Sequence, residues 1–239
     1  MEIKVIGTGS KGNCYILTNN KGSQLMLDCG LPYKTISKGL NYNIQKLKGC
    51  LITHEHKDHC LSADNWSGCG IEVFTPYTMD NPYGVRKYGD FTVQTFEVPH
   101  NGTKCFGFYI KTEGQKILYL TDLSRCPLSF KDVKVNHILV ECNFQMEYIN
   151  TDGSNFKHKS QGHHSLDECI HFIQRSKTGA LMTVILVHGG QGCVPSECVA
   201  KVKAEVGEDV NVYFAEAGME ISLNDYSDRY PTTDESETP

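Results

Sequence analysis

The sequence predicts an α+β protein in which two β-sheets are sandwiched between helices. Short apolar stretches with strand-like alternation occur in both halves of the chain, and stretches with helical periodicity lie between them. No internal repeat or linker divides the 239 residues, a length that suits one large domain. We therefore expect one folded domain over residues 1–223, followed by an acidic tail, residues 224–239, that is predicted to be disordered.

Three predicted strands open the chain, joined by turns rich in glycine and asparagine. Their ranges are 1–7, 14–18 and 24–30. Residues 33–45 are predicted to form a helix, which Gly39 weakens from inside. A fourth strand is expected to begin at Cys50.

The rest of the chain alternates between strands and helices. Residues 78–89 are polar and contain glycine and proline, so we expect a loop over the functional site. Ser165 is the expected N-cap of a helix, with Glu168 at the capping-box position. The predicted helices are 63–68, 166–176 and 194–205, and the predicted strands are 71–75, 91–98, 106–111, 117–122, 135–141, 183–188 and 210–215.

Composition favours a cytoplasmic protein with reduced thiols. No stretch approaches the roughly eighteen apolar residues of a membrane helix, and no signal peptide precedes the first strand, so we expect no membrane partner. The eleven cysteines are an odd number with no Cys-x-x-Cys pair, which is typical of buried free thiols in a reducing compartment. The net charge of −5 disfavours a large non-specific nucleic-acid surface, although bound metal ions could supply positive charge locally.

The densest group of chemically active side chains follows the apolar run that begins at Cys50. Three histidines and one aspartate fall within six positions: His54, His56, Asp58 and His59. His54 and His56 alternate along an extended segment, so both point to one side, while the other two lie on the turn that follows. Because one tetrahedral ion does not easily accept all four, the spacing favours two adjacent metal ions.

Other potential ligands share a position in the predicted fold, because each stands at or just beyond the C-terminal end of a strand. Residues delivered from strand ends can meet at one edge of a sheet sandwich. This pattern predicts one shared metal centre. The strand-end acids and histidines are Asp28, His54, His100, Asp122, Glu141 and His188.

These motifs resemble the metallo-β-lactamase superfamily, whose His-x-His-x-Asp-His signature is matched at residues 54–59. More narrowly, the chain is similar to the single-domain YycJ/WalJ-type hydrolases, regarded as DNA exonucleases. The segments that carry the narrower resemblance are 7–14, 100–109, 141–143 and 162–165. The resemblance implies a four-layer αββα sandwich of two mainly antiparallel or mixed sheets.

The resemblance also implies metal ligands in two groups bridged by Asp122, and a catalytic role for Asp58 besides its role as a ligand. Asp28 would lie behind a ligand histidine and orient it. The ligands of the first ion would be His54, His56 and His100, and those of the second Asp58, His59 and His188. Zinc is the expected metal, with manganese or iron as alternatives that suit the same donors.

His163 is the remaining catalytic candidate. Gly162-His163 before a helix resembles a motif of the tRNA 3′-end-processing branch, in which the histidine is a general acid toward the leaving oxygen. His164 is its competitor for that role, whereas His137, His158 and His171 are interpreted as structural.

The expected function is two-metal-dependent hydrolysis of phosphodiester bonds by a metal-activated water, with nucleic acid as substrate as in DNA exonucleases. The alternative is a phosphodiesterase for small cyclic nucleotides, which the acidic net charge suits better. Hydrolysis of a thioester or lactam is a third enzymatic interpretation, and a non-catalytic scaffold a fourth. A homodimer is an oligomeric state that the sequence leaves open.

Overall fold

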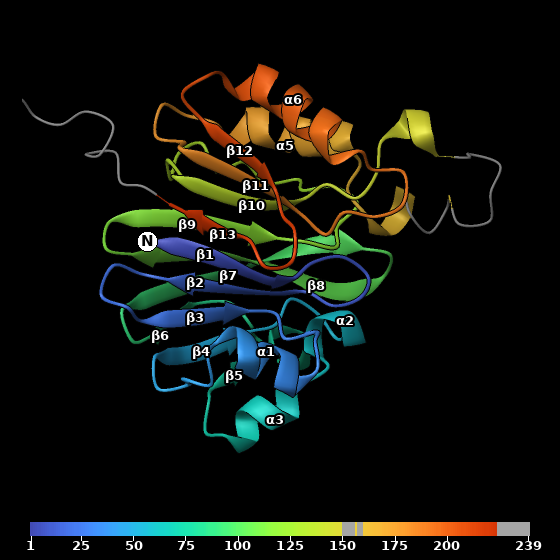
Figure 1. Cartoon of the computed structure of the whole chain (residues 1–239). Coiled ribbons are helices and arrows are strands. Elements are labelled where there is room, and N and C mark those ends of the chain that lie inside the picture. Colours follow the sequence, from blue (N-terminus) through green and yellow to red (C-terminus); the bar gives the residue numbers. More distant parts are fainter. Residues whose placement is uncertain (150–155, 157–159, 224–239) are drawn as a thin grey trace, which may run out of the picture.

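The computed structural model describes residues 1–149, 156 and 160–223, which form two β-sheets that pack face to face (Figure 1). The predicted tail, His158 and most of the segment before Gln161 lie outside the described residues. Within the described part of the chain, no helix is long and apolar enough to cross a membrane.

The first sheet has six strands of mixed direction. Its order is β13 (Glu220–Ser222), β1 (Glu2–Gly7), β2 (Cys14–Thr18), β3 (Gln24–Leu27), β4 (Leu47–Leu51) and β5 (Val73–Phe74). The pairs from β13 to β3 are antiparallel, and the β3–β4 and β4–β5 pairs are parallel.

The second sheet has seven strands and is also mixed. Its order is β12 (Asn211–Phe214), β11 (Thr183–Val187), β10 (His137–Glu141), β9 (Gln115–Leu120), β8 (Thr103–Thr112), β7 (Phe91–His100) and β6 (Val85–Tyr88). Strands β12 to β9 are parallel to their neighbours, and the pairs from β9 to β6 are antiparallel.

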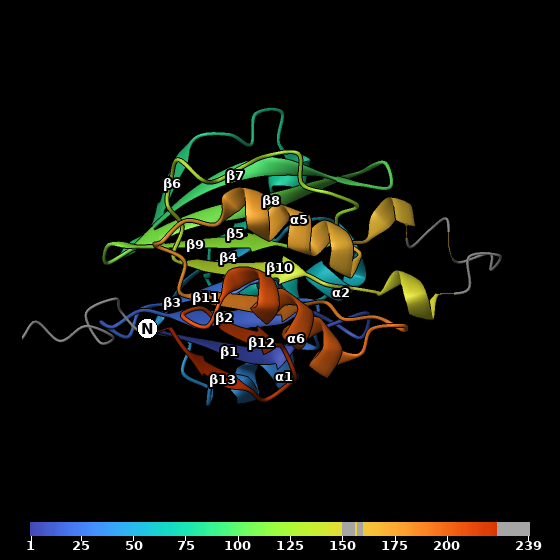
Figure 2. The ribbon, with the colours of Figure 1, turned by 90° about the horizontal axis from the view of Figure 1, so that it is seen from above.

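Helices cover the outer face of each sheet, which completes the αββα arrangement (Figures 1 and 2). Two of them, α1 (Tyr33–Gly39) and α3 (Ala63–Gly68), pack on the first sheet, and α5 (Leu166–Ser176) and α6 (Pro195–Val206) pack on the second. The short elements are α2 (Lys57–Cys60), η1 (Pro76–Thr78) and η2 (Met146–Tyr148). The predicted fold class is therefore confirmed.

Three apolar layers hold this arrangement together. The central layer lies between the sheets and includes Tyr15, Phe108 and Tyr119, all fully buried. An outer layer around Trp66 seals α1 and α3 to the first sheet, and another around Phe172 seals α5 and α6 to the second. Burial of such side chains stabilises the fold by about 1.5–3 kcal/mol for each of the larger ones, and it fixes the strand ends that carry the site.

The fourth strand begins at Leu47 and not at Cys50, and two larger local predictions are wrong. Residues 78–89 do not form only a loop over a site, because Val85–Tyr88 pairs with β7 as the edge strand of the second sheet. The polar residues that suggest a loop are those of a half-exposed edge strand. The helix predicted over 33–45 ends at Gly39, and Asn41 and Tyr42 then adopt positive φ angles of 51° and 59°. By contrast, α5 has its predicted bounds, with the Ser165 side chain accepting a hydrogen bond from the Glu168 amide.

Candidate metal centre

All six strand-end residues lie where the sequence predicts, at or shortly after the last residue of a strand. Three of them, Asp28, Asp122 and His188, have left-handed backbone conformations with φ of 57°, 52° and 53°. Such conformations cost a non-glycine residue about 1–3 kcal/mol and concentrate at functional sites. At these positions the backbone turns sharply out of the strand. The turn directs the side chain to the edge of the sandwich where the strand ends meet.

One group of ligand atoms forms around His56. The Nδ1 of His56 lies 2.9 Å from Nε2 of His54 and 3.3 Å from Nε2 of His100. Oδ2 of Asp122 lies 3.7 Å from the same His54 nitrogen and 3.9 Å from the His100 nitrogen. These four residues offer ligand atoms that all lie within 4.8 Å of one another.

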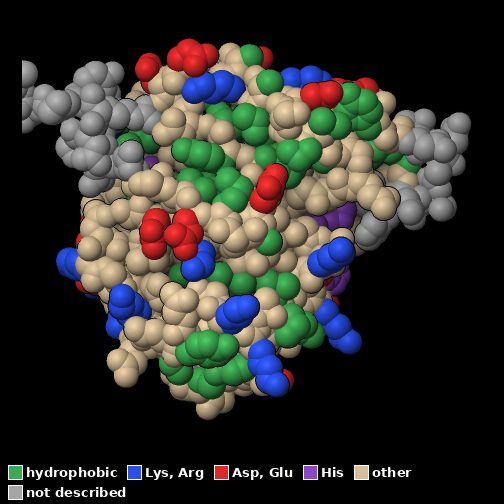
Figure 3. Space-filling model, in the orientation of Figure 1, with side chains coloured by type: hydrophobic (Ala, Val, Ile, Leu, Met, Phe, Trp, Pro, Cys, Tyr) green, Lys and Arg blue, Asp and Glu red, His purple; other side chains and the backbone are tan. Residues whose placement is uncertain are grey.

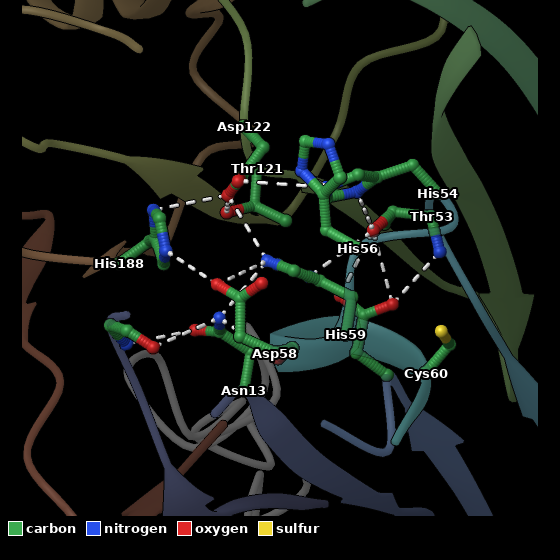
Figure 4. Close-up of polar contacts among 12 residues, drawn as sticks. Asn13, Thr53, His54, His56, Asp58, His59, Cys60, Thr121, Asp122 and His188 are labelled. Carbon is green, nitrogen blue, oxygen red and sulfur yellow. Dashed lines mark hydrogen bonds and ion pairs between the residues drawn. The ribbon is translucent and has the colours of Figure 1, made fainter. Parts of the chain in front are cut away.

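A second group forms on the other side of Asp122 (Figure 4). Nε2 of His59 lies 3.3 Å from Oδ1 of Asp122 and 3.5 Å from Oδ2 of Asp58. Nε2 of His188 lies 3.7 Å from that same Asp58 oxygen. The four residues again meet within 4.8 Å, and Asp122 directs one oxygen toward each group.

The chemistry of these donors fits divalent metal ions. Imidazoles and carboxylates are the ligands of zinc, manganese and iron in proteins. Nε2 of His188 is buried and has no hydrogen-bond partner among the described residues, although an unpaired buried polar atom is costly. A metal ion between this nitrogen and Asp58 would remove that cost.

Asp28 lies behind His59, on the side away from the ligand atom. Its Oδ2 is 2.8 Å from Nδ1 of His59, and it accepts hydrogen bonds from the Thr53 amide and hydroxyl and from the Tyr119 hydroxyl. This contact fixes the ring so that Nε2 of His59 faces Asp122 and Asp58. Such a carboxylate–histidine pair is a common device for orienting a metal ligand.

Glu141 contacts two histidines of the site at once. The sequence places Glu141 at a strand end but does not show these contacts. Its Oε1 lies 2.7 Å from Nδ1 of His163 and 2.9 Å from Nδ1 of His188, and its Oε2 accepts hydrogen bonds from the amides of Leu123 and His164. One buried carboxylate therefore positions both the candidate general acid and a candidate ligand.

The structure separates the two neighbouring histidines. His163 lines the cavity at the site and stacks beside His188 with ring centroids 5.3 Å apart. His164 is fully buried, with its Nδ1 near the carbonyl oxygen of Glu141, and burial lowers its pKa to about 4. Only His163 of this pair lines the cavity. His137, interpreted as structural, is buried in β10 with Nε2 3.2 Å from Gln115, and His171 is exposed.

The cavity has a volume of about 450 Å³ and opens to solvent at the edge where both groups of ligands meet. Histidine side chains reach the surface at this edge, with Lys and Arg side chains nearby (Figure 3). Phe144 is buried, so its side chain packs in the core instead of lining the cavity. The lining residues are Ser10, His56, Asp58, His100, Asp122, Asn143, His163, His188, Gly190 and Gln191.

The site holds acidic and basic side chains close together, and their charges shift one another's pKa values. Burial disfavours the charged form of His188, but Asp122, Asp58 and Glu141 outweigh it and raise its pKa to about 10. Burial likewise opposes ionisation of Glu141, yet His163 and His188 lower its pKa to about 2. For His163, burial lowers the pKa, but Glu141 outweighs it and raises the pKa above its ordinary value. Glu141 therefore favours the protonated form of His163.

Gly30 allows the chain after β3 to lie directly against α2. A Cβ atom at this position would stand 1.7 Å from the carbonyl oxygen of Asp58, and the neighbouring Cys29 amide donates to the His59 carbonyl. We expect Gly30→Ala to displace α2 and to lower the free energy of unfolding by about 1–3 kcal/mol, the usual cost of overpacking. Chemical denaturation measures this loss. Gly68→Ala is the matched control, because its Cβ would meet nothing within 4 Å, and equal losses in both variants would contradict the steric argument.

Fold and site together define a metallo-β-lactamase fold with a histidine- and aspartate-rich centre of the kind that binds divalent metal. Comparison with solved structures agrees: YhfI from Bacillus subtilis, a metallo-β-lactamase fold protein, superposes with a TM-score of 0.72 over 92% of this chain and 97% of YhfI, at 19% sequence identity.

Sequence comparison gives the relatives. Exodeoxyribonuclease YycJ from Bacillus anthracis is 26% identical over 180 residues, which cover 62% of this chain and 65% of YycJ. The family model of the Anti-Pycsar protein Apyc1 matches residues 1–66, and Apyc1 from Paenibacillus xerothermodurans is 32% identical over 94 residues, 34% of this chain and 38% of that protein. The chain thus spans less than two thirds of these relatives' lengths. It shares the metallo-β-lactamase fold with YhfI and is similar in sequence to YycJ.

Proposed function

We propose that the protein is a hydrolase that uses two divalent metal ions to cleave phosphodiester bonds, with nucleic acid as its substrate. The observation that carries the proposal is the presence, in one cavity, of two ligand groups that share Asp122 and of a histidine positioned by a buried carboxylate. The relationship to exodeoxyribonuclease YycJ supports nucleic acid as the substrate.

Seven residues would hold the ions, in the two groups described above. When bound, the ions would lower the pKa of a water molecule and offset the negative charge that develops on the phosphoryl oxygens. Zinc is the proposed metal and manganese an alternative, because the donors are imidazole nitrogens and carboxylate oxygens without a thiolate. Asp28 and Glu141 keep His59 and His188 in the orientations that direct their Nε2 atoms into the site.

His163 is the proposed general acid. Its Nδ1 faces Glu141, and its Nε2 is the proposed donor of a proton to the leaving oxygen of the substrate. Since Glu141 favours the protonated imidazole, His163 holds the proton needed for general acid catalysis to a higher pH than an ordinary histidine does. Proton donation favours phosphodiester cleavage, because an alkoxide is a poor leaving group until it is protonated.

A phosphodiesterase for small cyclic nucleotides remains the second candidate, because the net charge of −5 suits a small substrate better than a nucleic-acid polymer. The same residues would perform the same chemistry on a cyclic nucleotide. The two candidates therefore differ in the substrate and not in the catalytic groups.

An assay with metal-loaded protein distinguishes them. Purified protein is incubated with zinc or manganese and, separately, with single-stranded DNA, a tRNA precursor and cyclic mononucleotides. We expect DNA to be shortened from an end while cyclic nucleotides persist, and chelation to abolish the reaction. Cleavage of cyclic nucleotides alone would contradict the choice of nucleic acid, and turnover that survives complete removal of metal would contradict the metal mechanism.

The pH dependence tests the pairing of Glu141 with His163. Because the raised pKa keeps His163 protonated, activity should fall as pH rises through that pKa. Glu141→Gln removes the negative charge that raises this pKa, so the alkaline limb of the kcat/KM profile should move to lower pH. The exposed Glu147 provides the control variant Glu147→Gln, whose profile should not move. An unchanged alkaline limb in Glu141→Gln, with metal content intact, would exclude this role for the pair.

A further inference from the structure

A second cluster of metal-ligating side chains lies behind the active cavity, on the side of α5 and α6. Cys142 directly follows β10, Cys193 precedes α6, and Cys198 lies in the first turn of α6. Their sulfur atoms all lie within 4.8 Å of one another, and those of Cys193 and Cys198 are 3.2 Å apart. Cys169 of α5 adds a fourth thiol beside Cys142.

We propose that Cys142, Cys193 and Cys198 form a binding site for a thiophilic divalent cation of the zinc class, separate from the histidine and aspartate centre. Donors that are all sulfur select soft or borderline ions such as zinc or cadmium. A tetrahedral zinc with bonds of about 2.3 Å separates its sulfur ligands by about 3.8 Å, so adjustments of well under an ångström at each sulfur bring the cluster to this geometry.

The surroundings of the cluster favour a thiolate at Cys198, whereas contacts among the neighbouring thiols and burial raise the pKa of Cys142 and of Cys193. Cys142 and Cys198 are fully buried, and Cys193 is partly exposed, which gives an ion a path of entry. The N-terminal turn of α6 places partial positive charge at Cys198, and contacts with Cys142 and Cys193 lower the pKa of Cys198 to about 4. A bound ion would favour loss of the thiol protons and would neutralise most of the charge of the thiolates that hold it.

Gln145 completes the wall of the site. Its Oε1 accepts hydrogen bonds from the Val194 amide at 2.8 Å and from the Cys198 thiol at 3.3 Å. Gln145 also contacts the loop beside the active cavity, because its backbone amide donates a hydrogen bond to the carbonyl of Gly192. A bound ion would therefore tie the end of β10 to α6 and to the loop whose Gly190 and Gln191 line the active cavity.

A simple disulfide explains the arrangement less well. A disulfide would join only Cys193 and Cys198, and it would not explain why Cys142 lies beside them. The observed separation of 3.2 Å is also well beyond the roughly 2.05 Å of a bonded pair.

Cobalt(II) provides a direct test, because sulfur ligands give thiolate-to-cobalt charge-transfer absorption that nitrogen and oxygen ligands do not. The whole protein is reduced, freed of metal and titrated with cobalt(II). We expect a charge-transfer band whose final intensity corresponds to one thiolate-bound cobalt per chain, in addition to the ions taken by the histidine and aspartate centre. The band should persist in Asp58→Ala and disappear in Cys193→Ser and Cys198→Ser. Cys69→Ser, which changes an exposed cysteine, should keep the band.

A second measurement uses the unchanged chain, so it does not depend on whether a variant folds. Zinc should protect Cys193 from alkylation while leaving the exposed Cys69 reactive. No band with excess cobalt, a band that survives in both cysteine variants, or a Cys193–Cys198 disulfide in the metal-free protein that zinc does not prevent would each overturn the proposal. Because the readouts are spectral and chemical, they are independent of whether the protein cleaves a phosphodiester.

Discussion

Replacing Asp58 with alanine is expected to reduce hydrolysis by roughly 10³-fold or more, since loss of one ion's stabilisation of the transition state costs about 4 kcal/mol. Asp58 belongs only to the second ligand group, where its Oδ2 faces both His59 and His188. The variant should therefore lose about half of its bound metal in the active centre while keeping the group formed by His54, His56 and His100. Elemental analysis after dialysis and a turnover assay measure the two effects.

Glu55→Ala is the matched control for this experiment. Glu55 lies in the same short motif and carries the same charge, but its side chain is exposed. Its removal should leave metal content and turnover close to those of the unchanged protein. Full activity in Asp58→Ala would refute the proposed metal mechanism, and equal losses in both variants would show that charge in the motif, and not ligation, is responsible.

His163→Ala is expected to slow turnover by about 10²–10⁴-fold, the range for loss of a general acid, while metal content stays unchanged. The reason is that His163 contacts Glu141 and lines the cavity but belongs to neither of the two ligand groups that contain the signature motif. The loss should shrink for a substrate whose leaving group needs no protonation, such as an aryl phosphodiester.

The control for His163 is the exposed His171 on α5, whose replacement by alanine should leave turnover unchanged. Loss of metal from His163→Ala would instead assign this residue as a ligand, in the group that it can form with Asp122, Glu141 and His188. An equal loss for ester substrates with good and poor leaving groups would exclude proton donation.

The sequence predicts where the candidate ligands gather, because they follow strands whose apolar patterns are strong. A strand end fixes where a side chain emerges, and the ends of neighbouring strands lie at one edge. The positions of Asp28, Asp122 and His188 follow from this rule alone. Their left-handed backbone angles do not follow from it, because aspartate and histidine, although enriched among non-glycine residues with positive φ, adopt that conformation too rarely to signal it as glycine does.

Other features depend on contacts between distant segments and are invisible in the sequence. Glu141 contacts His163 and His188, which lie 22 and 47 residues further along the chain. Cys142 meets Cys193 only because β10 and the loop before α6 converge, and a thiol spacing of this length matches no metal-binding motif. The edge strand β6 has too many polar residues, and β13 too few residues, to be recognised locally. The homodimer and the cytoplasmic location stay predictions.

Anomalous X-ray diffraction from crystals of the zinc- or manganese-loaded protein tests the central claim most directly. We expect two peaks at the active centre, about 3.5–4 Å apart. One should be flanked by His54, His56 and His100 and the other by Asp58, His59 and His188, with Asp122 between them. A single peak, or two peaks that do not share Asp122, would contradict the two-metal mechanism on which the proposed hydrolysis depends.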